Sequence, residues 1–378
     1  MSNTVKWIIA IVVALVIVWV VLSIERNATQ RPPQSELIKI GAILPLTGWG
    51  AYWGEPEKRG IDLAKNEITA GGGRVEVLVE DGGTDPAKST SAAQKLINVD
   101  MVQGFFTEFT GPASAVAPLS AQYMVPLIYD AVTKKPLEAS QYALKAYFDM
   151  DKQCFVAAQA LVKEGKKKIG TLVLNLDFNS ECKSAVARAL AGTDAKEFDY
   201  DIKNDTVDFR TIIVKMKADG VDGLVPVFYE DNAVAFFRQI GDLRFKPAIF
   251  MGIGVPDGFT DKVRSSATTE VLEGVRTYDQ KINPSFRNKV LQKYPGIEDK
   301  DILAAAYGYD ETMYLYRAIA ACGAKRDATC ATAKILADTS YQGALDAVHF
   351  GPDRILNLTP YYFVYKSGKL EGFSPTTD

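Results

Sequence analysis

The stretch from Ile38 to Ile68 constrains the fold of this chain more than any other part of its sequence. The apolar run from Ile38 to Leu46 is too short for a helix and ends among turn-forming residues, which indicates a buried strand of a parallel sheet. From Pro56 to Ile68, apolar residues recur at helical spacing with charges between them. The loop between these elements carries three aromatic residues, Trp49, Tyr52 and Trp53. Ligands bind at the carboxyl end of the first strand of an open α/β sheet, so we expect these rings at a binding site.

The alternation of short apolar strands with helices continues along the chain and predicts an α/β fold with parallel sheets. A first series has strands at 75–80, 102–106 and 126–129 and helices at 87–98 and 112–123. A second series has strands at 168–175, 197–201, 224–229 and 247–252 and helices at 154–163, 180–190, 209–218 and 232–240. Two series of similar size predict two lobes, with residues 146–151 as the first crossing between them.

The opening unit also carries a family resemblance. Its markers are the run Leu44 to Gly48 (Leu-Pro-Leu-Thr-Gly), the pair Trp53 and Gly54, and the run Gly60 to Ala64. They resemble the start of mature branched-chain amino acid (Leu/Ile/Val) binding proteins, which are type I periplasmic solute-binding proteins of ABC transporters. Further markers follow in the same order, namely Glu80 to Ser89, Ala115 to Pro118, Val125 to Ile128 and Phe250 to Gly252.

The resemblance implies two Rossmann-like, doubly wound lobes joined by a hinge of three crossings. The first lobe is then expected to contain residues 38–148 and 283–340, and the second residues 149–282 and 341–378. Hinged lobes around a cleft are suited to closing on a ligand.

The amino-terminal residues differ in character from the rest of the chain. Residues 1–24 include the run Trp7 to Ile24, which is apolar or small throughout and long enough for a transmembrane helix. No Ala-x-Ala-like cleavage site follows this run, so we expect an uncleaved membrane anchor, with a cleaved signal segment as the alternative. Residues 25–37 are polar, contain Pro32 and Pro33, and are predicted to form a short stiff linker.

Composition narrows the functional classes. The single His makes a His-based metal or acid/base site improbable, and the formal net charge of −3 does not suggest a nucleic-acid partner. We found no Gly-x-Ser-x-Gly, His-Glu-x-x-His or P-loop motif. We therefore expect a protein that is not an enzyme and that holds no cofactor.

The four cysteines are an even number, which weakly suggests disulfides outside the cytoplasm. Cys322 and Cys330 flank a short polar loop between two helical patterns, so a local bridge is expected there. Cys154 and Cys182 are each expected near the start of a helix in the second lobe. They either pair or remain two small buried thiols.

The binding residues of the first lobe follow mainly from the resemblance. Pro112 suits the first position of a helix, and Thr110 or Gly111 its cap, which leaves backbone N–H groups and a hydroxyl for an anion. The family binds the ligand carboxylate here. Ala131 and Thr133 correspond to further amino-acid contacts of the family, and Trp53 corresponds to its aromatic wall.

The second lobe is expected to supply the opposite wall. Phe178 corresponds to a family position that covers the ligand, with a core phenylalanine as the alternative. Tyr229 and Glu230 end a strand, where an acid is a natural partner for an ammonium group. The family's own ammonium-binding acid corresponds to Gly254, so either Glu230 or Asp257 replaces it or the ligand lacks an α-ammonium.

The sequence therefore predicts an extracytoplasmic solute-binding protein, anchored to the cell membrane by its amino-terminal helix. It would capture an amino acid or a similar small polar solute between its lobes and deliver it to the membrane subunits of an ABC importer. The alternative is a membrane-tethered ligand sensor with the same fold that acts through a partner protein.

Overall fold

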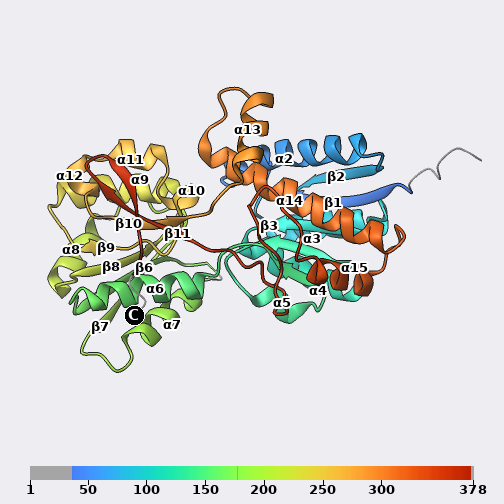
Figure 1. Ribbon diagram of the computed structural model, residues 1–378. Coiled ribbons are helices and arrows are strands. Elements are labelled where there is room, and N and C mark those ends of the chain that lie inside the picture. Colours follow the sequence, from blue (N-terminus) through green and yellow to red (C-terminus); the bar gives the residue numbers. More distant parts are fainter. Residues whose placement is uncertain (1–35, 177, 376–378) are drawn as a thin grey trace, which may run out of the picture.

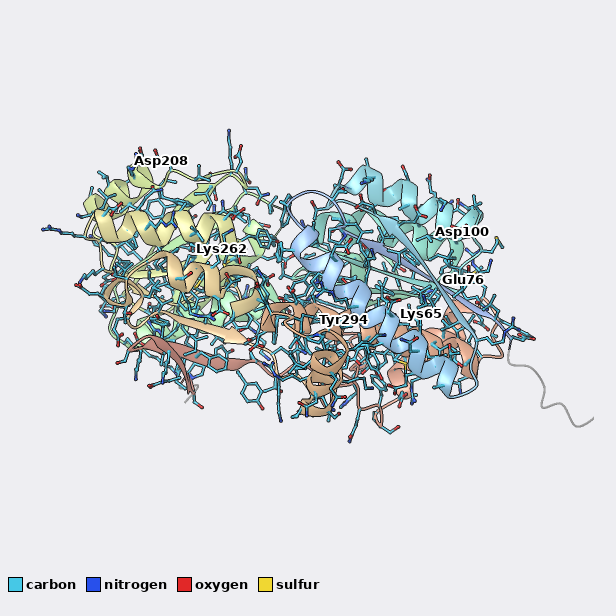
Figure 2. The ribbon with its side chains drawn as sticks, turned by 90° about the horizontal axis from the view of Figure 1, so that it is seen from above. Lys65, Glu76, Asp100, Asp208, Lys262 and Tyr294 are labelled. Atoms are coloured by element: carbon cyan, nitrogen blue, oxygen red, sulfur yellow. A yellow bond between two sulfur atoms is a disulfide. The ribbon has the colours of Figure 1, made fainter. Side chains whose placement is uncertain are left out.

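The computed structural model describes residues 36–375 except residue 177 and shows two α/β lobes side by side (Figure 1). The first lobe contains the amino-terminal strands, and the second contains the middle of the chain. In a view from above, Lys65, Glu76 and Asp100 mark the first lobe, and Asp208 and Lys262 mark the second (Figure 2). The predicted transmembrane run and most of the predicted linker lie outside the described residues. No helix within the described part of the chain is both long and apolar enough to span a membrane.

The first lobe is built on a parallel sheet with the strand order β2-β1-β3-β4-β5. Its strands are β1 (Ile38–Leu44), β2 (Val75–Asp81), β3 (Gly104–Glu108), β4 (Leu127–Asp130) and β5 (Ala143–Lys145). Two helices, α2 (Ala51–Ala70) and α14 (Asp299–Ala321), pack in the apolar core on one face of the sheet. The other face packs against α3 (Pro86–Asn98) and α4 (Thr110–Tyr123). The shorter helices are α5 (Lys135–Ala139), α13 (Pro284–Lys293) and α15 (Ala328–Ala337).

The second lobe has a parallel sheet with the strand order β7-β6-β8-β9 and a separate antiparallel sheet, β10-β11-β12. The parallel strands are β6 (Lys168–Leu174), β7 (Lys196–Ile202), β8 (Gly223–Val227) and β9 (Ala248–Ile249). The antiparallel strands are β10 (Arg276–Asp279), β11 (Tyr361–Lys366) and β12 (Lys369–Phe373). The helices are α6 (Met150–Lys163), α7 (Asn179–Leu190), α8 (Arg210–Asp219), α9 (Glu230–Asp242), α10 (Val255–Gly258), α11 (Asp261–Ser266) and α12 (Thr269–Leu272). The predicted α/β architecture with parallel sheets is confirmed.

The chain passes three times between the two apolar cores. Phe148 belongs to the first core and Met150 to the second, so the first crossing lies between them. The chain returns between Val275 and Tyr278 and crosses again before Tyr365, which packs in the second core.

Residues 341–356 pack with the first lobe, whereas the sequence analysis assigned them to the second. Tyr341, Ala344 and Leu345 lie in the core of the first lobe. Asp310 on α14 anchors the start of this segment, since its carboxylate accepts hydrogen bonds from the Tyr341 hydroxyl (2.6 Å) and from the Ala344 (2.7 Å) and Leu345 (2.8 Å) amides. The strand-like tail that the sequence predicted for the second lobe is confined to β11 and β12.

The aromatic segment after β1 also differs from the prediction of a loop. Helix α2 begins at Ala51, so Tyr52 and Trp53 lie in its first turn. Trp53 points into the core of the first lobe and is only 4% exposed. Trp49 remains in the preceding loop and is 41% exposed.

Candidate functional site

A cavity between the lobes gathers residues from the carboxyl ends of strands in both sheets. It encloses about 410 Å³ of empty space, part of which is open to solvent. Ligands of open α/β sheets bind at this edge, beyond the carboxyl ends of the strands. The first lobe lines the cavity with Trp53, Glu108, Phe109, Thr110, Asp130, Ala131, Val132 and Tyr147. The second lobe lines it with Met150, Tyr229, Ile253 and Asp257.

The wall from the first lobe combines an aromatic ring with hydrogen-bonding groups at the start of α4. Thr110 is the first residue of α4, which has no side-chain cap, so its first amide groups have no acceptor from a preceding turn. Phe109 connects β3 to this helix with φ 62° and ψ 151°, a conformation that costs a non-glycine residue about 1 to 3 kcal/mol. The strained residue therefore lies directly at the cavity, where it turns the chain from the strand into the helix.

Asp257 is the acidic residue that the second lobe contributes to the cavity. Its carboxylate accepts hydrogen bonds from the Tyr147 hydroxyl at 2.6 Å and from the Tyr52 hydroxyl at 3.5 Å, both from the first lobe. Burial raises the pKa of Asp257 to about 6, although the two tyrosine hydrogen bonds oppose that change. Asp257 thus joins the lobes and presents a titratable acceptor to the cavity.

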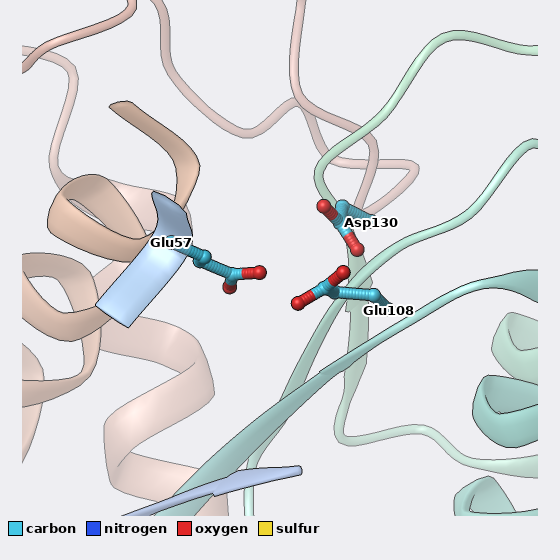
Figure 3. Close-up of side chains that lie close together, drawn as sticks. All are labelled: Glu57, Glu108 and Asp130. Carbon is cyan, nitrogen blue, oxygen red and sulfur yellow. The ribbon is translucent and has the colours of Figure 1, made fainter. Parts of the chain in front are cut away.

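Three further carboxylates meet at the floor of the cavity, namely those of Glu57, Glu108 and Asp130. One oxygen of each lies within 4.8 Å of the other two, and the side chains point toward one another (Figure 3). All three are buried, with exposed fractions of 0%, 2% and 6% in that order. The Trp53 indole N–H donates to Asp130 Oδ2 at 3.2 Å. Asp130 Oδ1 and both oxygens of Glu108 have no hydrogen-bond partner among the described residues, and the Glu57 carboxyl meets that of Glu311 on α14, with which it can share a hydrogen.

Glu57 is buried because α2 and α14 cross unusually closely. A Cβ atom on Gly60 would lie 1.8 Å from the Ala305 carbonyl oxygen, and one on Gly308 would lie 2.5 Å from the Glu57 carbonyl oxygen. Only glycine permits this approach. The close crossing removes the Glu57 face of α2 from water and turns its carboxylate toward Glu108 and Asp130.

The charges in this cluster disfavour one another. Burial, and then the charge of Asp130, raise the pKa of Glu57 well above its usual range. Burial also raises the pKa of Asp130, while the hydrogen bond from Trp53 opposes the change. Glu311 on α14 shows the same pattern, because burial and the charges of Asp130 and Glu57 raise its pKa.

Four of the eight predicted site residues line the cavity, namely Trp53, Thr110, Ala131 and Tyr229. The other four lie outside the lining. Thr133 is fully buried and its hydroxyl donates to Glu181, while Phe178 packs in the core of the second lobe. Glu230 accepts a hydrogen bond from Thr260 at 2.6 Å and pairs with Lys262, and Gly111 packs near Pro86.

Sequence reasoning did not identify Glu108, Tyr147, Met150 or Ile253 as site residues. Glu108 had a visible signal, because an acid ends the otherwise apolar strand Gly104–Glu108 near the carboxyl edge of the sheet. Tyr147 and Met150 lie at the first crossing between the lobes, where no local sequence pattern indicates a binding residue. Only the packing of the lobes against each other brings them to the cavity.

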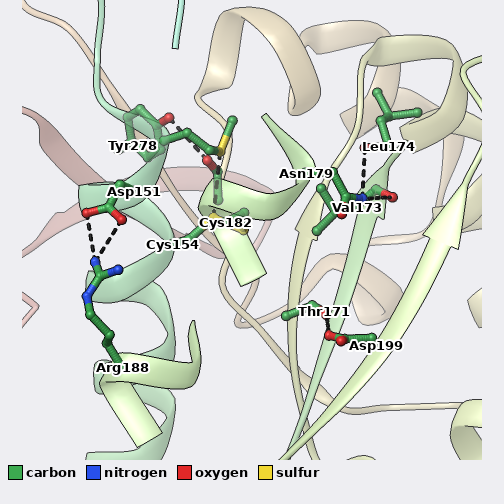
Figure 4. The surroundings of a disulfide bond; sticks show 12 residues. Asp151, Cys154, Thr171, Val173, Leu174, Asn179, Cys182, Arg188, Asp199 and Tyr278 are labelled. Carbon is green, nitrogen blue, oxygen red and sulfur yellow. Dashed lines mark hydrogen bonds and ion pairs between the residues drawn. A yellow bond between two sulfur atoms is a disulfide. The ribbon is translucent and has the colours of Figure 1, made fainter. Parts of the chain in front are cut away.

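A disulfide supports the wall of the second lobe. Cys154 on α6 is bonded to Cys182 on α7, which joins the helix that begins at Met150 to its neighbour (Figure 4). The Asp151 carboxylate pairs with Arg188 across the same two helices at 2.7 Å. A second disulfide joins Cys322 to Cys330 in the first lobe, as the sequence predicted.

The chain is similar to known binding proteins over most of its length. A family model described as periplasmic binding protein matches residues 37–368. Leu/Ile/Val-binding protein homolog 7 of Brucella abortus is 28% identical over 255 residues, a match that covers 62% of this chain and 63% of that relative. Leu/Ile/Val-binding protein homolog 6 of Brucella suis is 27% identical over 311 residues, which is 78% of each chain.

Solved structures share the fold at lower identity. A leucine-binding protein from Thermotoga maritima superposes with a TM-score of 0.77 at 20% identity, covering 89% of this chain and 98% of that one. A solute-binding protein of an ABC transporter from R. palustris, in complex with 4-hydroxybenzoate, superposes with a TM-score of 0.76 at 24% identity, covering 89% and 97%. These similarities establish a type I periplasmic binding protein fold.

Proposed function

Because this chain belongs to the periplasmic binding protein family, we propose that it is an extracytoplasmic solute-binding protein that delivers an amino acid or similar small polar solute to an ABC importer. The observation that carries the proposal is the cavity between the lobes, to which both lobes contribute aromatic rings and carboxylates. A solute that contacts both walls stabilises the closed form over an open one, so the conformation of the protein differs between the solute-bound and the solute-free state. The membrane subunits of an importer would bind the closed, solute-bound conformation.

The polar groups of the cavity favour a solute with an ammonium group. Asp257 and Asp130 are acceptors from opposite lobes, and the lining contains no Lys or Arg within the part of the chain that the structure describes. A carboxylate of the same solute would bind the Thr110 hydroxyl and the amides at the start of α4. The rings of Trp53, Tyr147 and Tyr229 would cover its apolar part, with a contribution of about 1.5 to 3 kcal/mol from burial.

The proposal includes binding without chemical conversion, as in the related proteins. The lining offers acceptors, aromatic rings and one threonine hydroxyl, and Asp257 is held by two tyrosines in a way that suits a fixed acceptor. The benzoate complex of the R. palustris protein adds aromatic carboxylates to the candidate solutes, and an aromatic wall would accommodate them as well.

The test is a thermal-shift and calorimetric panel on the purified protein. The panel contains amino acids, alkylamines of matching side chain, the corresponding carboxylic acids without the amino group, and 4-hydroxybenzoate. We expect stabilisation by a solute that carries an ammonium group. Asp257→Asn should weaken its binding by about 1.5 to 3 kcal/mol, because a hydrogen bond to a charged group is lost.

Asp261→Asn is the matched control, since Asp261 lies on α11 in the same lobe and pairs with Arg264 at the surface. It should leave solute affinity unchanged. Stabilisation by the acids alone would remove the ammonium from the proposal, and an affinity that Asp257→Asn does not alter would remove Asp257 from the site. No stabilisation by any solute of these classes would overturn the proposed solute class.

A further inference from the structure

The cluster of Glu57, Glu108 and Asp130 requires a positive charge that the described residues do not supply. The buried lysine nearby, Lys145, donates its ammonium hydrogens to the carbonyl oxygens of Tyr147 and Phe148 instead. We propose that the three carboxylates form a binding site for a hard divalent cation of the Ca²⁺ type at the floor of the cavity.

The spacing of the carboxylate oxygens matches such an ion. Oxygen ligands lie about 2.3 to 2.6 Å from Ca²⁺, so two ligands on opposite sides of the ion are about 4.8 Å apart. The chosen oxygens of Glu57, Glu108 and Asp130 lie within 4.8 Å of one another. Their positions are therefore those of ligands around one ion, with water free to complete the coordination.

The lack of protein partners is a second observation that points to a ligand. Both oxygens of Glu108 and Asp130 Oδ1 are buried and have no hydrogen-bond partner among the described residues, and Glu57 meets only another carboxyl group, that of Glu311, with which it can share a hydrogen. Buried polar groups in proteins are almost always hydrogen-bonded, because an unsatisfied polar group is costly and an unsatisfied charge more so. A cation that faces all three carboxylates would satisfy these oxygens at once.

A bare ion fits the position better than the ammonium group of a solute. Glu108 and Asp130 line the cavity, whereas Glu57 lies outside its lining. An occupant that reaches all three must sit below the solute space, and an ammonium group would carry its carbon skeleton there. A divalent ion also neutralises two of the three negative charges, whereas an ammonium neutralises one.

This inference goes beyond the proposed function, because all three ligands come from the first lobe and the ion needs no solute. The consequence for the site is that most of the negative charge at this end of the cavity is neutralised, although the described lining has no Lys or Arg. A bound ion would then leave Asp257 as the acidic side chain of the lining that remains free for an ammonium group.

Direct cation binding tests the site without any solute. The full-length protein is stripped with EDTA, dialysed at pH 7.5 and titrated with CaCl₂ by calorimetry, and then with Tb³⁺ while indole fluorescence is excited. We expect one site per chain. We also expect sensitised Tb³⁺ emission that Ca²⁺ displaces, because the Trp53 indole N–H binds Asp130 directly.

Glu57→Gln and Glu108→Gln should each lower Ca²⁺ affinity at least tenfold. Both variants should keep the wild-type fold by near-ultraviolet circular dichroism, because an amide of the same shape replaces each carboxyl group and can still donate to Glu311 from position 57. Glu197→Gln is the matched control: Glu197 is a half-buried acid of β7 with one unpartnered oxygen and a pKa that burial raises to about 7. It should leave the affinity unchanged.

Several outcomes would overturn the proposal. One is a stripped protein that binds neither Ca²⁺, Mg²⁺ nor Mn²⁺ at millimolar concentration, which would mean that the carboxyl groups are protonated and share hydrogens. Another is binding that Glu57→Gln and Glu108→Gln leave intact. Binding of methylammonium with no effect of metal would assign the cluster to an ammonium group. Because the titrations contain no solute, their failure leaves the proposed transport function standing.

Discussion

Two buried carboxylates occupy consecutive positions on α14 and have opposite surroundings. Asp310 accepts hydrogen bonds from the Tyr341 hydroxyl and from the amides of Ala344 and Leu345. Glu311, equally buried at 2% exposure, has no N–H or hydroxyl donor among the described residues and meets only another carboxyl group, that of Glu57, with which it can share a hydrogen. Asp310 faces the returning segment 341–345, whereas Glu311 interacts electrostatically with Glu57 and Asp130 near the cavity. The comparison shows that two equally buried acids on one helix can have opposite hydrogen-bonding surroundings.

Electrostatics follow the same division. Burial raises the pKa of Asp310 to about 6, and its three hydrogen bonds limit the rise. Burial and two neighbouring carboxylates raise the pKa of Glu311 well above its usual range, with no comparable relief from donors. Keeping Glu57, Asp130 and Glu311 ionised within one lobe therefore carries a cost to stability.

The largest effect expected from this comparison is on stability. Asp310→Ala should lower the free energy of unfolding by about 3 to 5 kcal/mol, because three buried donors lose their acceptor. Glu311→Gln should change it far less, since an amide can keep a hydrogen bond to Glu57 and a buried acid is replaced by a neutral group. Urea unfolding in EDTA measures both values.

The informative result is which of these two variants lowers the free energy of unfolding more. If Glu311→Gln destabilised the protein as strongly as Asp310→Ala, Glu311 would have structural partners and the distinction between the two acids would fail. If Asp310→Ala were nearly neutral, the segment 341–345 would be held in the first lobe by its apolar contacts alone.

The pH dependence of stability tests the same buried carboxylates, and its expected effect is smaller than that of Asp310→Ala. A carboxyl group whose pKa is higher in the folded state binds protons more tightly there, so its contribution to stability falls as pH rises from about 4 through the folded value. Asp257 and Asp310, with pKa values raised to about 6, should each make the ion-free protein about 1 kcal/mol more stable at pH 5 than at pH 7.

Denaturant unfolding at a series of pH values in EDTA checks this sign. Saturating Ca²⁺ should stabilise the protein more at pH 7 than at pH 5, because protons compete with the ion for Glu57 and Asp130. A stability that increased from pH 5 to pH 7 in EDTA would contradict the burial of ionised carboxylates in the folded state.

The smallest expected effect concerns two threonines that the family resemblance places at the site. Thr110 lines the cavity, so Thr110→Val should weaken solute binding by about 1 kcal/mol. Thr133 instead donates to Glu181 and does not line the cavity, so Thr133→Val should lower stability by a similar amount and change affinity little. Calorimetry with the solute identified in the panel, together with urea unfolding, separates the two effects. An affinity loss confined to Thr133→Val would reverse this assignment.

Local patterns in the sequence were sufficient for the elements and for much of the first wall. The α/β series is predicted by the apolar runs of strands such as Ile38–Leu44 and Lys168–Leu174 and by the periodicity of the helices. A strand that is buried on both faces of a parallel sheet needs apolar residues at nearly every position, so its sequence shows a continuous apolar run. Thr110 and Trp53 could be placed near the cavity for a related reason, since each follows a strand end. The disulfide between Cys322 and Cys330 could be predicted because only a short loop separates the two residues.

Only the tertiary structure decided which acids meet and which segments return. Glu57 lies on a helix whose charges would ordinarily face water, and its burial depends on the close crossing of Gly60 and Gly308, two positions far apart in the chain. Which of Glu230 and Asp257 lies at the cavity depended on the docking of the lobes, which brings Tyr52 and Tyr147 to Asp257 and leaves Glu230 with Thr260 and Lys262. The position of residues 341–356 depended on the hydrogen bonds of Asp310 to residues 341–345 and on the contacts of residues 348–356 with the core and strands of the first lobe. Local residue patterns specify local structure, whereas contacts between distant segments depend on the sum of many weak interactions that no short stretch of sequence displays.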